Sequence, residues 1–269
     1  MAEYKDFFKD VEPVEVVFNC DICKDELFVV CDEEHADIEM SDILTLEPVY
    51  KRECECYKNK KNKLKFERKM KQSNLLSIYD EIKNTEYETK YEWQKEYKQQ
   101  VDKFVRNNDP ALVISGQTGS GKSLLLGKAL GNLMHLGRDS YYMQWGQDFK
   151  KLVNQYNKVG DEEEKFFRYL CTVDVLYIDD LFKTRSNDIA SVERKRIEID
   201  MFWELLNKRM YLKDCKTMIS TELFESDFAQ LDNSLRGRLL QLVTKKDNWI
   251  QMNTKEDRDI RVKKFNGEF

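Results

Sequence analysis

Eight residues from Gly116 to Ser123 have the types and spacing of a loop that binds phosphate groups. They match the pattern G-x-x-x-x-G-K-[ST] at every fixed position. Glycine permits the positive φ values that turn successive backbone N–H groups inward toward a phosphate. The lysine of this pattern reaches the β- and γ-phosphates of a nucleotide, and the final hydroxyl is a Mg²⁺ ligand. The expected nucleotide-binding residues are Gly116, Gln117, Thr118, Gly119, Ser120, Gly121, Lys122 and Ser123, and Ser123 is the expected Mg²⁺ ligand among them.

Two carboxylates follow an apolar run and supply the acidic groups that such a loop needs. Residues 175–178 (Val-Leu-Tyr-Ile) predict a buried strand, and Asp179 and Asp180 follow it directly. We expect Asp179 to orient Mg²⁺. Asp180 stands where a glutamate usually polarises the attacking water, and because its side chain is one methylene shorter, we expect slow hydrolysis. The alternative interpretation is an acidic cap for a helix that follows the strand.

Two short cysteine pairs near the N-terminus have the spacing of a tetrahedral zinc site. Cys20 and Cys23 form C-x-x-C, and Cys54 and Cys56 form C-x-C further along the chain. Each pair closes a small knuckle, so the four thiolates suit one Zn²⁺ ion. The alternative is a set of scattered reduced thiols. Cys31 and His35 are spare candidate ligands, whereas Cys171 and Cys215 flank predicted strands and are expected to be core residues.

The elements that must position these groups follow an alternating pattern. Short apolar runs of strand length alternate with segments of helical periodicity. The expected strands are 111–115, 140–144, 173–178, 216–220 and 249–252, and the expected helices are 122–136, 148–157 and 194–212. Such alternation predicts an α/β fold with a mainly parallel sheet that is covered on both faces.

Charge is unevenly distributed along the 269 residues. Residues 1–50 carry 15 acidic and three basic side chains, whereas residues 51–110 carry 16 basic and 11 acidic ones. A pI near 5.4 argues against binding to duplex DNA through bulk charge. The densest basic run, from Lys58 to Lys71, is a solvated face or linker, or else a contact with nucleic acid or an acidic partner.

Apolar segments are short throughout the sequence. No apolar run approaches the roughly 18 residues that a membrane span needs. The first six residues are polar or charged apart from Met1 and Ala2, which is unlike a secretory signal. We therefore expect a cytoplasmic protein without a membrane partner, in which the seven cysteines are free thiols or metal ligands.

The residues described so far, together with later ones, resemble the AAA+ ATPases, and more narrowly the DnaC/DnaI-type replicative helicase loaders of bacteria and phages. The resemblance runs from about Cys20 to about Arg261. Residues 216–223 are similar to the family's sensor-1 segment, with Glu222 where the family usually has asparagine. Either Thr221 positions a water there, or Glu222 takes over the role of the sensor. Residues 207–210 (Asn-Lys-Arg-Met) also match the family's pattern.

A second basic segment extends the resemblance. Residues 234–239 (Ser-Leu-Arg-Gly-Arg-Leu) are similar to the segment that carries the family's arginine finger. The resemblance implies that Arg238 reaches into a neighbouring subunit, with Arg236 in reserve. Little sequence follows the fifth expected strand, so we do not expect the helical lid of larger AAA+ proteins. The implied catalytic residues are Asp179, Asp180, Thr221 and Arg238.

The resemblance also implies a domain organisation. An AAA+ P-loop ATPase domain with a five-stranded parallel sheet would occupy residues 108–269. A charged helical linker would precede it at 58–107. Its aromatic residues are expected to pack against the ATPase domain, and the alternative is a platform on which nucleic-acid bases stack. The aromatic residues concerned are Tyr87, Tyr91, Trp93 and Tyr97. Residues 1–57 would form an acidic, cysteine-rich zinc module that docks on a helicase.

The function implied by the resemblance is the ATP-dependent loading of a DnaB-like replicative helicase onto single-stranded DNA. ATP, Mg²⁺ and Zn²⁺ are the implied cofactors, and ATP binding would promote self-association through the ATPase domains. Four basic residues would either touch DNA phosphates in a central groove or form a charged surface loop: Lys183, Arg185, Arg194 and Lys195.

Two other functions stay open at this point. One is an IstB-like transposition helper ATPase, whose partners are a transposase and duplex DNA. The other is a non-enzymatic adaptor whose nucleotide site acts as a switch. The cysteine pairs and the acidic pI favour the loader over the transposition helper, whereas Asp180 and Glu222 keep the adaptor open.

Overall fold

The computed structural model describes residues 19–41, 48–156, 161–183, 189–252 and 259–267. The chain divides into two compact units, Met1–Lys65 and Phe66–Phe269, which we call the N-terminal unit and the sheet unit. The division falls within helix α1 (Glu55–Gln72). Among the described residues, every helix is too short or too polar to cross a lipid bilayer.

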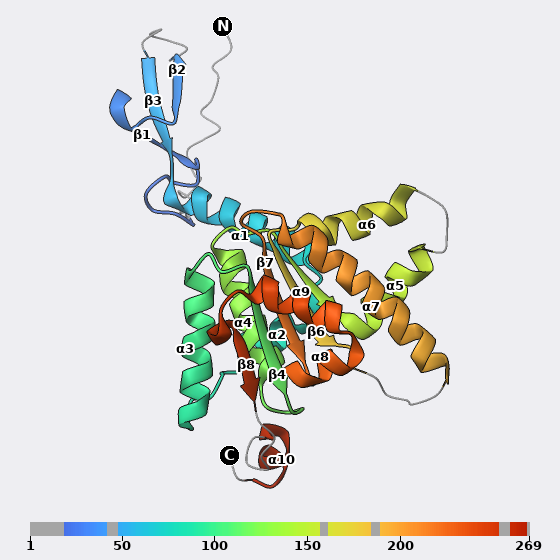
Figure 1. Cartoon of the computed structure of the whole chain (residues 1–269). Coiled ribbons are helices and arrows are strands. Elements are labelled where there is room, and N and C mark those ends of the chain that lie inside the picture. The colour runs from blue at the N-terminus through green and yellow to red at the C-terminus, as the bar shows by residue number, and fades with distance from the viewer. Residues whose placement is uncertain (1–18, 42–47, 157–160, 184–188, 253–258, 268–269) are drawn as a thin grey trace, which may run out of the picture. The chain divides into compact units, whose positions relative to one another are not determined.

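The N-terminal unit contains a small antiparallel sheet. Strand β3 (Pro48–Glu53) pairs with β1 (Phe28–Val30) on one side and with β2 (Ile38–Ser41) on the other, and the short helix η1 (Glu33–His35) lies between β1 and β2 in sequence (Figure 1). The buried side chains among its described residues are those of Cys23 and Cys54. This unit therefore builds no apolar core from the residues described, and another interaction must stabilise it.

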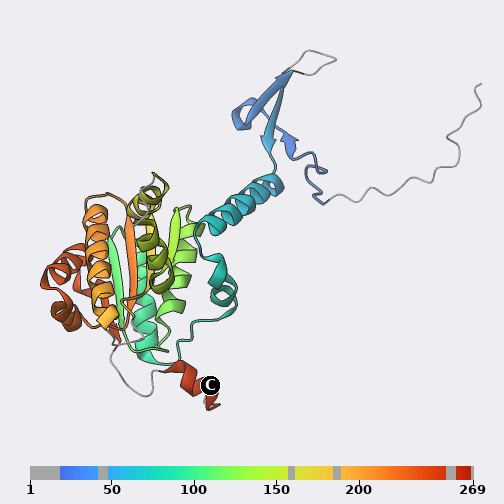
Figure 2. The same ribbon diagram turned by 90° about the vertical axis from the view of Figure 1, so that its right-hand side faces the viewer.

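The sheet unit is built on five parallel strands, as the sequence predicts. They are β4 (Ala111–Gly116), β5 (Ser140–Gln144), β6 (Val175–Leu181), β7 (Lys216–Thr221) and β8 (Trp249–Met252), arranged in the order β5-β6-β7-β4-β8 (Figure 2). The α/β class and the five-stranded parallel sheet are confirmed. Strand β6 extends beyond the expected end at residue 178, so both Asp179 and Asp180 lie within it.

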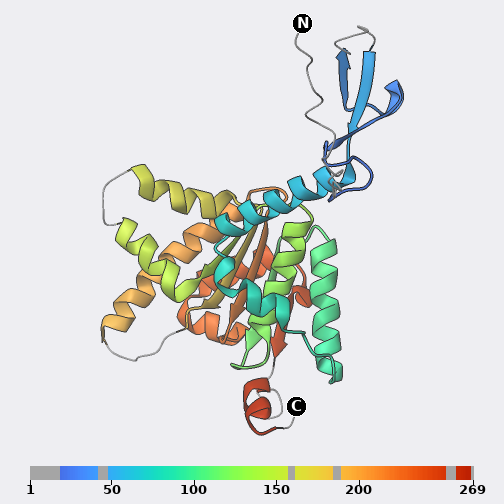
Figure 3. The same ribbon diagram turned by 180° about the vertical axis from the view of Figure 1, so that it is seen from behind.

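Helices cover both faces of this sheet. Successive side chains of a strand point to opposite faces, so apolar residues on both faces need a covering layer. In β4, Ala111 and Val113 join one buried cluster, while Leu112 and Ile114 join the other. The first cluster includes residues of α5 (Trp145–Tyr156), α6 (Asp161–Thr172), α7 (Ile189–Met210), α8 (Glu225–Leu231) and α9 (Asn233–Val243). The second includes residues of α1, α2 (Leu76–Asn84), α3 (Glu92–Arg106) and α4 (Lys122–His135) (Figure 3). Helices η2 (Lys246–Asn248) and α10 (Ile260–Phe265) complete the described elements.

The charged stretch 58–107 forms three helices, and much of it packs into the sheet unit. Leu75 and Phe104 are fully buried in the second cluster, and Tyr87 is buried there as well. Tyr97 packs against the same cluster and donates its hydroxyl to Gln251 O, while Tyr91 and Trp93 stack at a centroid distance of 6.1 Å. The packing expected of these aromatic residues is therefore seen for Tyr87 and Tyr97.

A buried arginine ties α7 to the start of two strands. The guanidinium of Arg209 donates to Leu170 O, Val173 O and Lys216 O at 2.8–2.9 Å, and to Thr217 Oγ1 at 2.9 Å. Burial lowers its pKa to about 10, which leaves the side chain charged at neutral pH. Arg209 therefore supplies donors to carbonyl groups at the end of α6 and at the start of β7. These hydrogen bonds stabilise the sheet at the amino ends of its strands, opposite the phosphate loop.

Candidate functional site

The glycine-rich loop connects the end of β4 to the start of α4. Gly116 has a φ of 132° and Gly121 a φ of 85°, so both adopt conformations that favour glycine. A Cβ atom at Gly116 would lie 2.1 Å from Met252 O of the adjacent strand β8. Glycine is thus required at this position by both backbone conformation and space.

Lys122 is held along this loop by backbone carbonyl groups. Its Nζ donates to Gly116 O at 2.8 Å and to Gln117 O at 2.7 Å. Burial lowers the pKa of the ammonium group to about 8, although the nearby carboxylates of Glu222 and Asp180 oppose this shift. A bound phosphate would replace the carbonyl oxygens as a stronger partner for this cation.

Ser123 and Asp179 form the acceptor set that a magnesium ion would need. The Ser123 hydroxyl donates to Asp179 Oδ1 at 2.9 Å, joining the start of α4 to strand β6. A hydroxyl beside a carboxylate at the phosphate loop suits Mg²⁺, which prefers oxygen ligands. The two residues fit the ion, which would supply charge neutralisation of the β- and γ-phosphates.

Three further hydroxyl groups converge on Asp179. Tyr177 donates to Oδ1 at 2.7 Å, Tyr142 donates to Oδ2 at 3.0 Å, and Ser220 also donates to Oδ1. Burial raises the pKa of both tyrosines, and the charge of Asp179 raises it further. Sequence reasoning did not identify these residues. The available signal was Tyr177, a tyrosine within an aliphatic strand two positions before a carboxylate.

Asp180 lies at an irregular point of strand β6. The register between β6 and β7 shifts between Ile178 and Leu181, and Asp180 has a φ of 55°. Its N–H donates to Ser220 Oγ at 3.0 Å. Because the strand is irregular here, the two carboxylates have different partners. Asp179 accepts hydrogen bonds from hydroxyl groups, whereas Asp180 accepts one from Lys183 Nζ at 3.2 Å.

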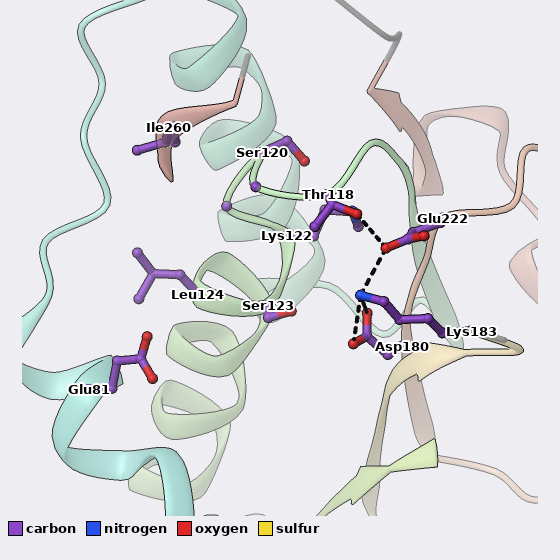
Figure 4. Close-up of a pocket in the computed structure, with 12 residues that line it drawn as sticks. Glu81, Thr118, Ser120, Lys122, Ser123, Leu124, Asp180, Lys183, Glu222 and Ile260 are labelled. Carbon is purple, nitrogen blue, oxygen red and sulfur yellow. Dashed lines mark hydrogen bonds and ion pairs between the residues drawn. The ribbon is translucent and has the colours of Figure 1, made fainter. Parts of the chain in front are cut away.

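The phosphate loop lines a pocket (Figure 4). The sticks in Figure 4 place Asp180, Lys183 and Glu222 on one side of Lys122 and Ser123, and Glu81, Leu124 and Ile260 on the other. The pocket is lined by Glu81, Thr118, Gly119, Ser120, Gly121, Lys122, Ser123, Leu124, Asp180, Lys183, Glu222 and Ile260. Six of the eight expected nucleotide-binding residues therefore line one pocket.

Glu222 lines this pocket, whereas Thr221 does not. The Glu222 carboxylate accepts from Thr118 Oγ1 at 2.5 Å and from Lys183 Nζ at 2.8 Å. Burial raises the pKa of Glu222, but these hydrogen bonds outweigh burial and leave the pKa below its ordinary value. Thr221 is buried, donates to Leu181 O at 3.0 Å and accepts from Leu223 N, so its hydroxyl is used within the protein interior.

The two candidate finger arginines lie on α9 outside this pocket. Arg238 is half-buried, with its guanidinium 5.9 Å from the ring centroid of Trp203 and a hydrogen bond to Gln241. Arg236 forms an ion pair with Glu225 of α8. The charge of Arg236 is therefore paired within the chain, in an ion pair that joins α8 to α9. Arg238 instead contacts a ring face and a neutral amide within the part of the chain that the structure describes.

Of the four basic residues considered for DNA contact, Lys183 and Lys195 have described side chains. Lys183 lines the pocket, where it is bound by Asp180 and Glu222. Lys195 is half-buried on α7. Arg185 lies outside the described residues, as does the side chain of Arg194.

The four expected cysteine ligands meet in the N-terminal unit. The Sγ atoms of Cys20, Cys23, Cys54 and Cys56 all lie within 4.8 Å of one another. Two of the distances are 3.8 Å, between Cys20 and Cys54, and 3.4 Å, between Cys23 and Cys56. Zn–S bonds of about 2.3 Å in a tetrahedron place the sulfur atoms about 3.8 Å apart, so the cluster fits zinc.

The spare candidates are not part of this cluster in the described chain. Cys31 is half-buried and donates its N–H to Tyr50 O, and His35 pairs with Asp32.

The thiol of Cys20, within the cluster, is activated by its surroundings. Backbone N–H groups of Cys23 and Ile22 lower the pKa of Cys20 to about 7, which favours the thiolate that a metal binds. Cys171 is buried in the first cluster of the sheet unit, as expected, and Cys215 is half-buried.

Two curated relatives match the chain. It is 25% identical over 203 residues to the uncharacterized protein YqaM of Bacillus subtilis, covering 72% of this chain and 61% of that protein. It is 28% identical over 156 residues to the phage-like element PBSX protein XkdC of the same organism, covering 56% of this chain and 54% of that protein. The chain thus spans less than two thirds of the length of either relative. No protein-family model matches it.

The solved structures that are similar to the chain include those of DnaI and the DnaC helicase loader. The DnaI structure superposes with a TM-score of 0.48 at 17% identity, covering 66% of this chain and 89% of that one. The structure of the DnaC helicase loader gives a TM-score of 0.46 at 20% identity, covering 63% of this chain and 94% of that one.

Proposed function

We propose that the chain is a Mg²⁺-dependent ATPase of the AAA+ type that loads a DnaB-like replicative helicase onto single-stranded DNA. The observation that carries the proposal is the Ser123–Asp179 pair at the phosphate loop, on a chain that also brings four thiols together. The first feature supports binding of a nucleoside triphosphate with Mg²⁺. The second supports a zinc module, which we propose as the surface that docks on the helicase.

In this proposal the nucleotide controls association. ATP would bind along the loop 116–123, with Lys122 on its β- and γ-phosphates and Ser123 and Asp179 holding Mg²⁺. Asp180 would polarise the attacking water, and Arg238 of one subunit would stabilise the transition state in a neighbouring subunit. Binding would promote contacts between ATPase domains, and hydrolysis would release them. Residues 1–57, 58–107 and 108–269 would act as docking module, linker and ATPase domain.

A capture experiment with an immobilised hexameric replicative helicase tests the proposal. The full chain should be retained on the helicase, and Cys20→Ser should abolish retention while Cys31→Ser, a thiol outside the cluster, should not. Lys122→Ala should remove nucleotide binding without unfolding the sheet unit. If the wild-type chain binds ATP but no helicase is captured, the loader role is wrong, although the ATPase assignment stands.

One observation favours a second candidate function, a nucleotide-switched adaptor with little turnover. Lys183 binds Asp180, the residue proposed to polarise water, and thereby neutralises its charge. Measuring ATP turnover with and without single-stranded DNA separates the two candidates. A helicase-bound chain that binds ATP tightly but hydrolyses less than one equivalent would be the adaptor.

A further inference from the structure

The pocket contains an anionic group that the chain itself supplies. Glu222 accepts hydrogen bonds from Thr118 Oγ1 at 2.5 Å and from Lys183 Nζ at 2.8 Å. The first donor belongs to the phosphate loop, and the second lies two residues after the end of strand β6. A hydroxyl and an ammonium group are also the donors that phosphate oxygens prefer. Glu222 thus occupies two donors that suit a phosphate.

The position of this carboxylate relates it to the terminal phosphate of a nucleotide. Lys122 and Ser123 mark where the β- and γ-phosphates and their Mg²⁺ would lie. Glu222, Lys183 and Asp180 lie on one side of these residues, while Glu81, Leu124 and Ile260 lie on the opposite side (Figure 4). Asp179, the expected Mg²⁺ ligand, and Asp180 are neighbours at the end of strand β6. We therefore place the γ-phosphate on the side of the pocket that holds Asp180, Lys183 and Glu222.

Charge makes Glu222 and a γ-phosphate competitors. The carboxylate is bound to both Thr118 and Lys183, so a second anion placed there would be repelled until the carboxylate leaves. A nucleoside diphosphate ends one phosphate short and would leave the ion pair intact. Lys183 is also bound to Asp180 at 3.2 Å, so its release would change the partner of the proposed general base as well.

We propose that Glu222 is a latch in the γ-phosphate subsite, which the terminal phosphate of a nucleoside triphosphate displaces from Lys183 and Thr118. Lys183 then binds that phosphate from within the same chain, and Asp180 is freed from its ion pair. The latch makes the site respond to triphosphate and not to diphosphate. This inference rests on the proposed nucleotide binding and adds to it how the site recognises the γ-phosphate.

Binding of two fluorescent nucleotides tests the latch without relying on turnover. The probes are methylanthraniloyl-labelled ADP and the equally labelled, non-hydrolysable triphosphate AMPPNP, both with Mg²⁺. Glu222→Gln keeps the shape of the side chain and removes its charge, so the triphosphate should bind roughly tenfold more tightly. Lys183→Met should weaken triphosphate binding by roughly tenfold. Affinity for labelled ADP should change less than about twofold in both variants, which also shows that they are folded.

The ion pair between Glu204 and Lys208 on α7, at 2.9 Å, supplies matched controls outside the pocket. Glu204→Gln and Lys208→Met should leave both affinities unchanged. In the double variant Glu222→Gln with Lys183→Met, the gain from the first substitution should largely disappear. Equal effects on both nucleotides, or weaker triphosphate binding in Glu222→Gln, would overturn the latch while leaving the nucleotide site intact. Failure of the wild-type chain to bind either probe would overturn both proposals.

Discussion

The phenolic hydroxyl of Tyr177 lies 2.7 Å from Oδ1 of Asp179, two residues further along strand β6. Side chains two positions apart share one face of a strand, so this contact is built into the strand itself. Tyr142 reaches the other oxygen of the same carboxylate from β5, the neighbouring strand. The proposed Mg²⁺ ligand is therefore positioned by hydroxyl groups before any ion binds.

Removing the hydroxyl of Tyr177 should destabilise the sheet unit. In Tyr177→Phe the buried carboxylate of Asp179 loses a donor, which should lower the free energy of unfolding by about 1.5–3 kcal/mol. Urea denaturation followed by circular dichroism measures this change. Tyr169→Phe, at a residue that is 37% exposed, is the control and should cost less than about 0.5 kcal/mol. Equal stability of Tyr177→Phe and wild type would contradict the role of this hydrogen bond.

Nucleotide affinity should fall as the pH rises above 8. Burial lowers the pKa of Lys122 to about 8 in the free pocket, so above that pH the side chain is increasingly neutral. A bound phosphate favours the ammonium form, so binding then takes up a proton, and the dissociation constant should rise by up to about tenfold per pH unit. Below pH 8 the lysine is already charged and this dependence should vanish. Titrations of labelled ADP from pH 7 to 10 measure the effect. Lys122→Arg, which stays charged, should remove the dependence if Lys122 causes it.

The two aspartates should separate binding from turnover. Asp179→Asn should weaken Mg²⁺-dependent nucleotide binding, because the ion loses a charged acceptor. Asp180→Asn should spare binding and stop hydrolysis, since asparagine tolerates the positive φ of 55° at this position but cannot act as a base. Phosphate release and labelled-nucleotide titration measure the two properties. An unchanged hydrolysis rate in Asp180→Asn would show that another group polarises the water.

Purified protein should contain one zinc ion per chain. The N-terminal unit buries Cys23 and Cys54 among its described residues, so the metal should supply its folding free energy, on the order of 10 kcal/mol. Elemental analysis measures the zinc content. A strong chelator should make the N-terminal unit sensitive to protease, and ATP binding by the sheet unit should persist. A protein that contains no zinc and resists protease would refute the metal site.

Arg238 should act between subunits. Arg238 is held by Trp203 and Gln241 outside its own pocket, so Arg238→Ala should leave the nucleotide affinity of the monomer nearly unchanged. ATP turnover of the wild type should rise more than linearly with protein concentration, and the variant should lose this rise, since such arginines contribute on the order of 10³-fold or more in rate. Mixing Arg238→Ala with Lys122→Ala should restore some turnover. Turnover strictly proportional to concentration, without rescue in the mixture, would count against this arrangement.

The central sheet was predictable because its signals are local. The expected strands 140–144 and 249–252 coincide with β5 and β8, and those beginning at Ala111 and Lys216 extend by one residue. Strands β4 and β7 are buried at every position, which is typical of central parallel strands, whereas β8 alternates between buried and more exposed positions. The clustering of Cys20, Cys23, Cys54 and Cys56 was also predictable, because the spacing of the two cysteine pairs is typical of zinc ligands.

Other features depend on contacts that no local pattern reveals. Thr118 and Glu222 are 104 positions apart and meet because β4 and β7 are adjacent strands of the sheet. Lys183 was considered for DNA contact from its charge alone, and the structure places it between two carboxylates. Helix α8 has only seven residues, which leaves little periodic signal. The buried residues of α9, at 235, 239, 242 and 243, do have helical spacing, so that helix could have been predicted from the sequence and was missed.

The left-handed backbone at Asp180 restricts which amino acids can stand there. Glycine, asparagine and aspartate adopt this conformation most readily, and other residues pay roughly 1–2 kcal/mol for it. Aspartate is the one acid among the three, so a strand of this shape that needs a carboxylate favours aspartate over glutamate. The family that the sequence resembles usually carries glutamate here, and the backbone conformation at this position explains why aspartate replaces it. A search for similar proteins should accordingly accept a second aspartate at this position wherever the same irregularity in the strand precedes it.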